Sequence, residues 1–220
     1  MKVALFGTLT MGVVAAAALV AASEARRVPS LPYYADATLT PHWASSRREL
    51  DTAHTVGEFS LFDQTGHAMN RAVVANHVYV ASFFYSTCRT LCPALRTELA
   101  RVHDAFAKDT NVLILSHSVT PEADDVGRLA HYARVNGIDD RRWRLLTGSR
   151  SEVERLARER YFVELSDTTG NTVGRLRHTE TLVLIDGDGH IRGVYDGSLA
   201  FEVNQLIKDI RALRAPPKWN

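Results

Sequence analysis

Runs of apolar residues from position 77 onward divide the chain into alternating strands and helices. Residues 77–85 (HVYVASFFY) and 111–119 (NVLILSHSV) are rich in β-branched and aromatic side chains and have the length of strands. Helices are predicted where apolar residues recur every three or four positions, at residues 93–108 and 121–137 and in a segment that Ser149 or Ser151 caps. The middle of the chain therefore predicts the order strand, helix, strand, helix.

The C-terminal part predicts a β-hairpin followed by a helix. Residues 181–185 and 191–195 are apolar runs on either side of an Asp-Gly-Asp-Gly segment, and Asp-Gly pairs accept the positive φ of a tight turn. Residues 199–213 carry one apolar stripe at helical spacing. Shorter strands are predicted at residues 57–61, 72–74 and 144–146. This order predicts an α/β domain with a mixed sheet flanked by helices on both faces, which is the thioredoxin-like arrangement.

The N-terminus predicts an apolar helix. Residues 3–22 contain no charged side chain, and twenty helical residues span roughly the 30 Å of a bilayer's hydrocarbon core. The alternative is a cleaved secretory signal, because Lys2 precedes the apolar stretch and the small residues Ala21, Ser23 and Ala25 end it. The first interpretation gives a membrane-anchored protein whose domain faces the periplasm or another extracytoplasmic side. The second gives a protein that is secreted to the periplasm.

The rest of the chain predicts one globular domain. Residues 26–53 contain prolines and no clean apolar period, which is typical of a linker. The predicted organisation is residues 1–25 as membrane anchor or signal segment, 26–53 as linker, 54–214 as the thioredoxin-like domain and 215–220 as tail. With 26 basic and 25 acidic side chains the net charge is +1, which gives no electrostatic reason to expect binding to nucleic acid.

The candidate chemistry lies in the only two cysteines, Cys88 and Cys92. Pro93 follows them, so Cys92 is predicted at the start of a helix and Cys88 in the preceding turn. The free N–H groups and the dipole of a helix N-terminus favour a thiolate, so we expect lowered pKa values for both thiols. Thiolates bind metal ions or, when oxidised, form a disulfide between Cys88 and Cys92.

Two thiolates select soft ions such as Cu(I), and one added imidazole makes a set that holds either Cu(I) or Cu(II). Among nine histidines, His178 is the best candidate because it lies in a loop immediately before a predicted strand, where binding residues concentrate. By contrast, His117 is predicted to pack in the core, and His103, His131 and His190 to face solvent. The predicted metal ligands are therefore Cys88, Cys92 and His178.

The segments FFYSTCRTLCPAL, SHSVTPE and HTETLVLIDGDGHIRGVYDG resemble the Sco/SenC family over roughly residues 55–213. The resemblance implies a membrane-tethered, thioredoxin-like copper chaperone in which Cys88, Cys92 and His178 bind one copper ion. It further implies assistance in assembling the copper centre of cytochrome c oxidase. The implied partner is the copper-receiving subunit of a respiratory oxidase, with other copper carriers as further candidates. One departure is Thr120, where family members usually carry an aspartate.

A thiol-disulfide oxidoreductase that reduces cysteines of the oxidase subunit, or of another extracytoplasmic partner, is the alternative function. A low-pKa cysteine pair at a helix start suits that chemistry as well. Two features count against it: three residues separate the cysteines instead of the usual two, and no proline precedes the strand at residues 181–185. The sequence thus favours a metal-binding module over a turnover enzyme.

Overall fold

The computed structural model describes residues 31–89, 91–139, 141–164 and 180–214, and these residues form a mixed sheet of seven strands in the order β2-β1-β5-β4-β3-β6-β7. The strands are β1 (Ser60–Asp63), β2 (Ala68–Asn70), β3 (Val78–Phe84), β4 (Val112–Ser118), β5 (Trp143–Thr147), β6 (Thr181–Ile185) and β7 (Ile191–Asp196). The central strands β3, β4 and β5 are parallel, whereas β1 with β2 and β6 with β7 form antiparallel pairs at the two edges. This is the predicted thioredoxin-like arrangement.

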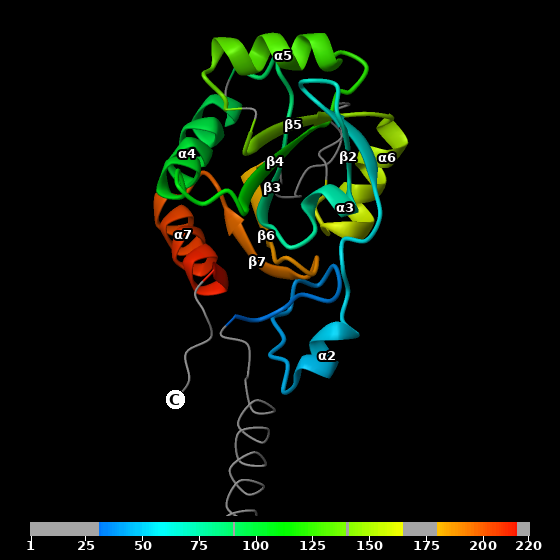
Figure 1. Cartoon of the computed structure of the whole chain (residues 1–220), viewed down its shortest axis with the longest axis vertical. Helices are drawn as coiled ribbons and strands as arrows, with labels where there is room; N and C mark the ends of the chain where they lie inside the picture. The colour runs from blue at the N-terminus through cyan, green and yellow to red at the C-terminus, as the bar shows by residue number, and fades with distance from the viewer. Residues whose placement is uncertain (1–30, 90, 140, 165–179, 215–220) are drawn as a thin grey trace, which may run out of the picture.

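Helices cover both faces of the sheet (Figure 1). They are α2 (Arg47–Asp51), α3 (Arg71–Val74), α4 (Leu91–Ala105), α5 (Val126–Val135), α6 (Arg150–Arg155), which continues into the π-helical turn η1 (Leu156–Arg160), and α7 (Ala200–Arg214). Buried side chains of α4, α5 and α7 share one core cluster, and those of α3, α6 and η1 share the other. The sheet therefore separates two hydrophobic cores.

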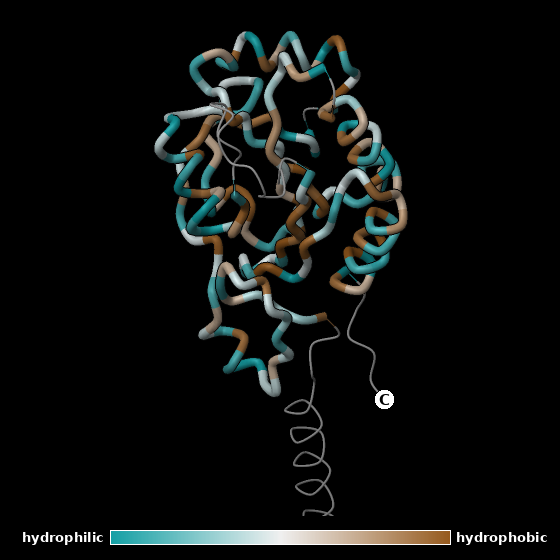
Figure 2. The backbone as a smooth tube through the Cα atoms, turned by 180° about the vertical axis from the view of Figure 1, so that it is seen from behind, coloured by the Kyte–Doolittle hydropathy of each residue, from teal (hydrophilic) through white to brown (hydrophobic). Residues whose placement is uncertain are grey.

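Strand β3 shows how the apolar pattern builds these two cores. Every residue of β3 is buried. Val78, Val80 and Phe84 pack toward α4 and α7, while Tyr79 and Phe83 pack toward α6, as the two-residue period of a strand requires. Hydrophobic stretches of the backbone concentrate in the central strands, whereas the helices alternate between hydrophobic and hydrophilic residues (Figure 2). A strand buried on both faces is a rigid support for the loop that follows it.

Two predictions of local structure are wrong. The helix predicted from residue 121 begins only at Val126, because the N–H of Asp124 closes a turn onto Thr120 and Asp125 caps the helix by accepting from the N–H of Arg128. Residues 72–74, predicted as a strand, belong to the short helix α3, which Asn70 caps by accepting from the N–H of Val73. In both places a side-chain oxygen determines where the helix begins.

The segment predicted as a linker contacts the domain. The Arg192 guanidinium donates to the main-chain oxygens of Leu31 and Pro32, and the N–H of Tyr34 donates to the carbonyl of Ile191. This segment and α2 lie at the opposite end of the molecule from α5 (Figure 1). The predicted N-terminal helix and C-terminal tail lie outside the described residues. Of the helices in the described part of the chain, none has the length and apolar composition that a membrane crossing needs.

Candidate metal centre

The two cysteines lie where β3 ends and α4 begins. After Phe84 the chain forms a tight turn in which the N–H of Cys88 donates to the carbonyl of Tyr85 across 3.2 Å. Helix α4 then begins at Leu91, so Cys92 and Pro93 stand in its first turn, where a proline removes no hydrogen bond. The structure therefore confirms Cys92 at the helix start and Cys88 in the turn before it.

The sulfurs of Cys88 and Cys92 contact each other. The N–H of Cys92 donates to Cys88 Sγ across 3.4 Å, and the two thiols hydrogen-bond with one another. The Tyr85 hydroxyl also hydrogen-bonds with Cys88, and this contact raises the pKa of Tyr85. No disulfide joins the two cysteines; Cys92 is buried and Cys88 half-buried. The pair can therefore bind one ion together or close into a disulfide.

The two cysteines differ in their electrostatic surroundings. Burial, followed by the hydrogen bond with Cys88, raises the pKa of the Cys92 thiol to about 12. The prediction of a lowered pKa at the helix N-terminus is therefore wrong for Cys92. Backbone hydrogen bonds do lower this pKa, but desolvation in the core outweighs them. Cys92 is thus a neutral thiol at physiological pH, and a metal ion must displace its proton in order to bind.

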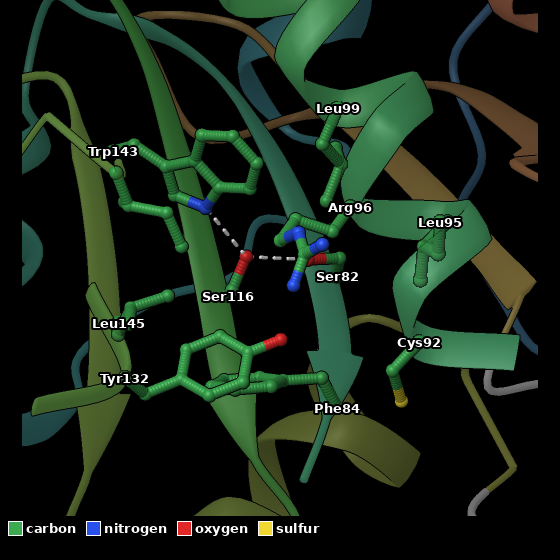
Figure 3. A pocket seen from close by; sticks show the side chains of 11 residues that line it. Ser82, Phe84, Cys92, Leu95, Arg96, Leu99, Ser116, Tyr132, Trp143 and Leu145 are labelled. Atoms are coloured by element: carbon green, nitrogen blue, oxygen red, sulfur yellow. Dashed lines mark hydrogen bonds between the residues drawn. The ribbon is translucent and has the colours of Figure 1, made fainter. Parts of the chain in front are cut away.

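A small pocket beside Cys92 shows how α4 is held against the sheet. The Ser116 hydroxyl hydrogen-bonds with Ser82 across 2.8 Å and accepts from the indole N–H of Trp143 across 3.0 Å. Arg96, one turn after Cys92 on α4, lines the same pocket (Figure 3). The polar groups of Ser82, Ser116 and Trp143 hydrogen-bond with each other, so these three residues support the helix and are not metal donors.

Asp124 lies near the cysteine turn, and the sequence alone offers no geometric reason to give it a role in place of the aspartate that Thr120 replaces. It lies six residues beyond the end of β4, is 1% exposed, and accepts from the main-chain N–H of Ser86 across 3.0 Å. The Thr120 hydroxyl donates to the same carboxylate across 3.1 Å. Thr120, which stands where the resemblance predicts an aspartate, therefore hydrogen-bonds with Asp124. A sequence signal existed in the hydroxyl residues of SHSVTPEAD that precede this aspartate.

His178 lies outside the described residues. Within those residues, no group of three His, Cys, Asp or Glu side chains is arranged to hold a metal ion. The described chain resumes at Glu180, whose carbonyl accepts from the N–H of Gly197 across 2.7 Å. Two predictions for other histidines are confirmed: His117 is fully buried and His131 is exposed. The prediction that His190 faces solvent is wrong, because His190 is buried and hydrogen-bonds with the carbonyl of His54.

Comparisons with known proteins agree with the fold. A family model described as SCO1/SenC matches residues 47–215. The SCO1 protein homolog of Bacillus subtilis (strain 168) is 25% identical over 161 residues, which cover 72% of this chain and 82% of that protein. The structure of BsSco, described as a member of the Sco family of cytochrome c oxidase assembly proteins with a disulfide switch, is 25% identical. It matches with a TM-score of 0.64 over 74% of this chain and 95% of its own.

A second solved structure shows the same fold. The structure of Bradyrhizobium japonicum ScoI with copper bound is 24% identical and has a TM-score of 0.56, covering 72% of this chain and 98% of its own. The mixed sheet and the helices on both faces are thus those of a thioredoxin-like Sco domain. Because the family model spans most of the sequence, the chain belongs to the SCO1/SenC family.

Proposed function

We propose that this chain binds one copper ion through Cys88, Cys92 and His178 and delivers it to the copper-receiving subunit of a respiratory oxidase. The observation that carries the proposal is the contact between the two cysteine sulfurs at the start of α4. Its relatives support it: BsSco is described as belonging to a family of cytochrome c oxidase assembly proteins, and ScoI of Bradyrhizobium japonicum is described with copper bound.

The donor set fits copper. Thiolate sulfurs are soft ligands that favour Cu(I), and a neutral imidazole nitrogen extends the set to Cu(II). The buried Cys92 thiol releases its proton when the ion binds, so copper affinity should rise with pH. Copper is here the cargo, and the protein supplies a preformed pair of sulfurs that receives it.

The path of the chain supports His178 as the third ligand. A methyl group on Gly197 would lie 2.4 Å from Leu95 Cδ1 and 3.0 Å from the carbonyl oxygen of Glu180, so Glu180 runs close beside α4. Leu95 is three residues beyond Cys92 on that helix. His178 precedes Glu180 by two residues, and two residues span at most about 7 Å. That reach is consistent with an imidazole that approaches the sulfurs.

The N-terminal residues determine, in this proposal, on which side of the membrane the domain works. Residues 1–25 act as a membrane anchor or a signal segment, and the domain at residues 54–214 works on the periplasmic or another extracytoplasmic side. The uncharged stretch at residues 3–22 supports this assignment. The mass of the mature N-terminus distinguishes a retained anchor from a cleaved signal.

Substitution of His178 tests the function. We expect His178→Ala to weaken Cu(II) binding sharply in a competition assay while it leaves the reduction potential of the Cys88–Cys92 pair nearly unchanged. His131→Ala is the matched control, because His131 is exposed on α5 and hydrogen-bonds only with the neighbouring Arg134 among the described residues. Unchanged copper stoichiometry and affinity in His178→Ala would overturn the ligand assignment.

The contact between the thiols also supports a second candidate, a thiol-disulfide reductant for the oxidase subunit or another extracytoplasmic protein. Reduction of a partner disulfide would oxidise Cys88 and Cys92 to a disulfide and pass two electrons and two protons to the partner. The measurement is the rate at which copper-free protein reduces such a disulfide. A rapid rate that is the same in wild type and in His178→Ala would favour this function.

A further inference from the structure

We propose that Asp124 is a positioning residue for the copper ligand Cys88, because its carboxylate ties the cysteine turn to the end of β4. The inference rests on the proposed function. No described contact joins the Asp124 carboxylate to either sulfur. Asp124 acts on the distance between the two sulfurs through the turn that carries Cys88.

Donors from two distant parts of the chain surround the buried carboxylate. From the cysteine turn, both the main-chain N–H and the hydroxyl of Ser86 donate to it. From the end of β4, the hydroxyls of Ser118 and Thr120 donate across 2.7 and 3.1 Å. A carboxylate that loses its water on burial is stabilised only when such donors replace it. Asp124 therefore holds Ser86 firmly against the rigid strand β4.

The link from Ser86 to the metal ligand is short. Ser86 follows Tyr85 and precedes Cys88 by two residues, and the turn closes through the bond from the Cys88 N–H to the Tyr85 carbonyl. The position of this turn determines whether Cys88 Sγ lies over the N–H of Cys92 at 3.4 Å. Loss of the Asp124 carboxylate should thus allow the sulfur of Cys88 to drift from that of Cys92.

A merely local role fits Asp124 poorly. The N-cap of α5 is the neighbouring residue Asp125, so Asp124 is not needed to begin the helix. Asp63 is a comparable buried aspartate whose printed partners all lie away from the cysteine turn: it is fully buried, accepts from Thr65 and His67 of its own hairpin and pairs with Arg144 of β5. Asp124 instead binds a residue 38 positions away, on the turn that carries a copper ligand.

The test compares Asp124→Asn with Asp63→Asn in the full chain. An asparagine amide is uncharged and has one oxygen where the carboxylate has two, so it cannot accept from the N–H and hydroxyl of Ser86 and the hydroxyls of Ser118 and Thr120 together, and the anchor should weaken. We expect Asp124→Asn to bind copper about 10-fold to 100-fold more weakly, as loss of an outer ligand partner does in metal sites. It should also shift the thiolate-to-Cu(II) absorption band and the reduction potential of the cysteine pair. Asp63→Asn should lower stability and leave all three unchanged.

Two milder variants keep the inference testable if Asp124→Asn does not fold. Ser86→Ala and Ser118→Ala each remove one hydroxyl from the same carboxylate, but only Ser86 lies on the cysteine turn. We expect Ser86→Ala to weaken copper binding and to shift the absorption band more than Ser118→Ala does. Equal effects of the two serine variants, or wild-type copper binding in a folded Asp124→Asn, would overturn the inference.

Failure of the proposed function is distinguishable from failure of this inference. If the wild-type chain bound no copper, the proposed function would fail on its own. The reduction potential of the cysteine pair would still report on the turn, since a displaced Cys88 closes a disulfide with Cys92 less readily. An unchanged potential in folded Asp124→Asn would then count against the positioning role.

Discussion

The main-chain N–H of Cys92 donates to the sulfur of Cys88 across 3.4 Å, while the sulfur of Cys92 is buried beneath the start of α4. One sulfur therefore lies at the positive end of the helix and the other in the core. The two cysteines are unequal partners, although they are equivalent in the motif. This inequality gives the reduced, copper-free protein a defined order of thiol reactivity.

We predict that an alkylating reagent modifies Cys88 well before Cys92 in reduced, copper-free protein. A thiol whose pKa is about 12 is thiolate in about one molecule in 10⁴ at pH 8, against about one in ten for the ordinary pKa of 9.0. Peptide mapping by mass spectrometry early in the reaction measures the order. Equal rates at the two cysteines would show that Cys92 is neither buried nor protonated as the structure has it.

The stability of the domain should depend on His117 between about pH 4 and 6.5. Burial lowers the pKa of His117 from 6.5 to about 4, so in this window the unfolded chain takes up the proton more readily than the folded one. Stability is therefore lost as the pH falls through the window, by about 3 kcal/mol from this residue. Denaturant unfolding of wild type and His117→Phe at several pH values measures it.

Replacement by phenylalanine isolates the contribution of the His117 proton. The His117 ring stacks on Phe83 with centroids 5.0 Å apart, and its Nδ1 hydrogen-bonds with the carbonyl of Ser82. A phenylalanine retains the stacking and cannot be protonated, so the slope of stability between pH 4 and 6.5 should flatten. An equally steep slope in His117→Phe would place the titrating group elsewhere.

Asp63 should also make the domain less stable as the pH falls, but at lower pH than His117. Burial raises its pKa, but hydrogen bonds from Thr65 and His67 and the charge of Arg144 together outweigh burial, so the net pKa of Asp63 is lowered. Its stabilising contribution is full above the unfolded-state pKa of 3.8 and is lost as the pH falls through the lower folded-state value. We expect Asp63→Asn to lose about 1–3 kcal/mol of unfolding free energy at pH 7.

That difference in unfolding free energy between wild type and Asp63→Asn should narrow toward pH 3. Below pH 3.8 the carboxyl of the unfolded wild-type chain takes up a proton more readily than that of the folded chain, in which Asp63 pairs with Arg144 at 2.8 Å, so part of the wild-type advantage is lost. Parallel denaturation curves at pH 7 and pH 3 provide the measurement. A gap that widened in acid would mean that Asp63 is not held in its ionised form by the fold.

Local patterns in the sequence were sufficient to predict the central strands and the cysteine turn. β3 and β4 follow from unbroken β-branched and aromatic runs, and Cys92 stands at a helix start because Pro93 is tolerated only in a first turn. These features depend on residues close to one another along the chain.

The features that sequence patterns missed depend on distant contacts. One such contact is the hydrogen bond that the buried Asp124 accepts from Ser86, which is 38 residues earlier in the chain. The raised pKa of Cys92 comes from burial beneath its own helix, and burial is a property of the assembled fold. His190 is likewise buried, and its ring hydrogen-bonds with the carbonyl of His54, which is 136 residues earlier in the chain.

Gly197 should be intolerant of even one added methyl group, because β6 and α4 approach each other closely there. A Cβ at this position would lie 2.4 Å from Leu95 Cδ1 and 2.9 Å from Leu182 Cγ, so the helix or the strand would have to move. We expect Gly197→Ala to lose about 1–3 kcal/mol of unfolding free energy, as overpacked cores do. It should also weaken copper binding, because the displaced segments lead to Cys92 and His178.

Two companion variants determine whether crowding at Leu95 is the cause. Gly127→Ala is the control for glycine replacement itself, since a Cβ there meets only Asp125 Oδ1 at an ordinary 3.5 Å and lies within α5; it should be neutral or stabilising by up to about 1 kcal/mol. Leu95→Ala makes room for the methyl group, so adding Gly197→Ala to it should cost less than in wild type. If Gly197→Ala lowered the unfolding free energy equally in wild type and in Leu95→Ala, crowding against Leu95 would not be the reason that Gly197 must be a glycine.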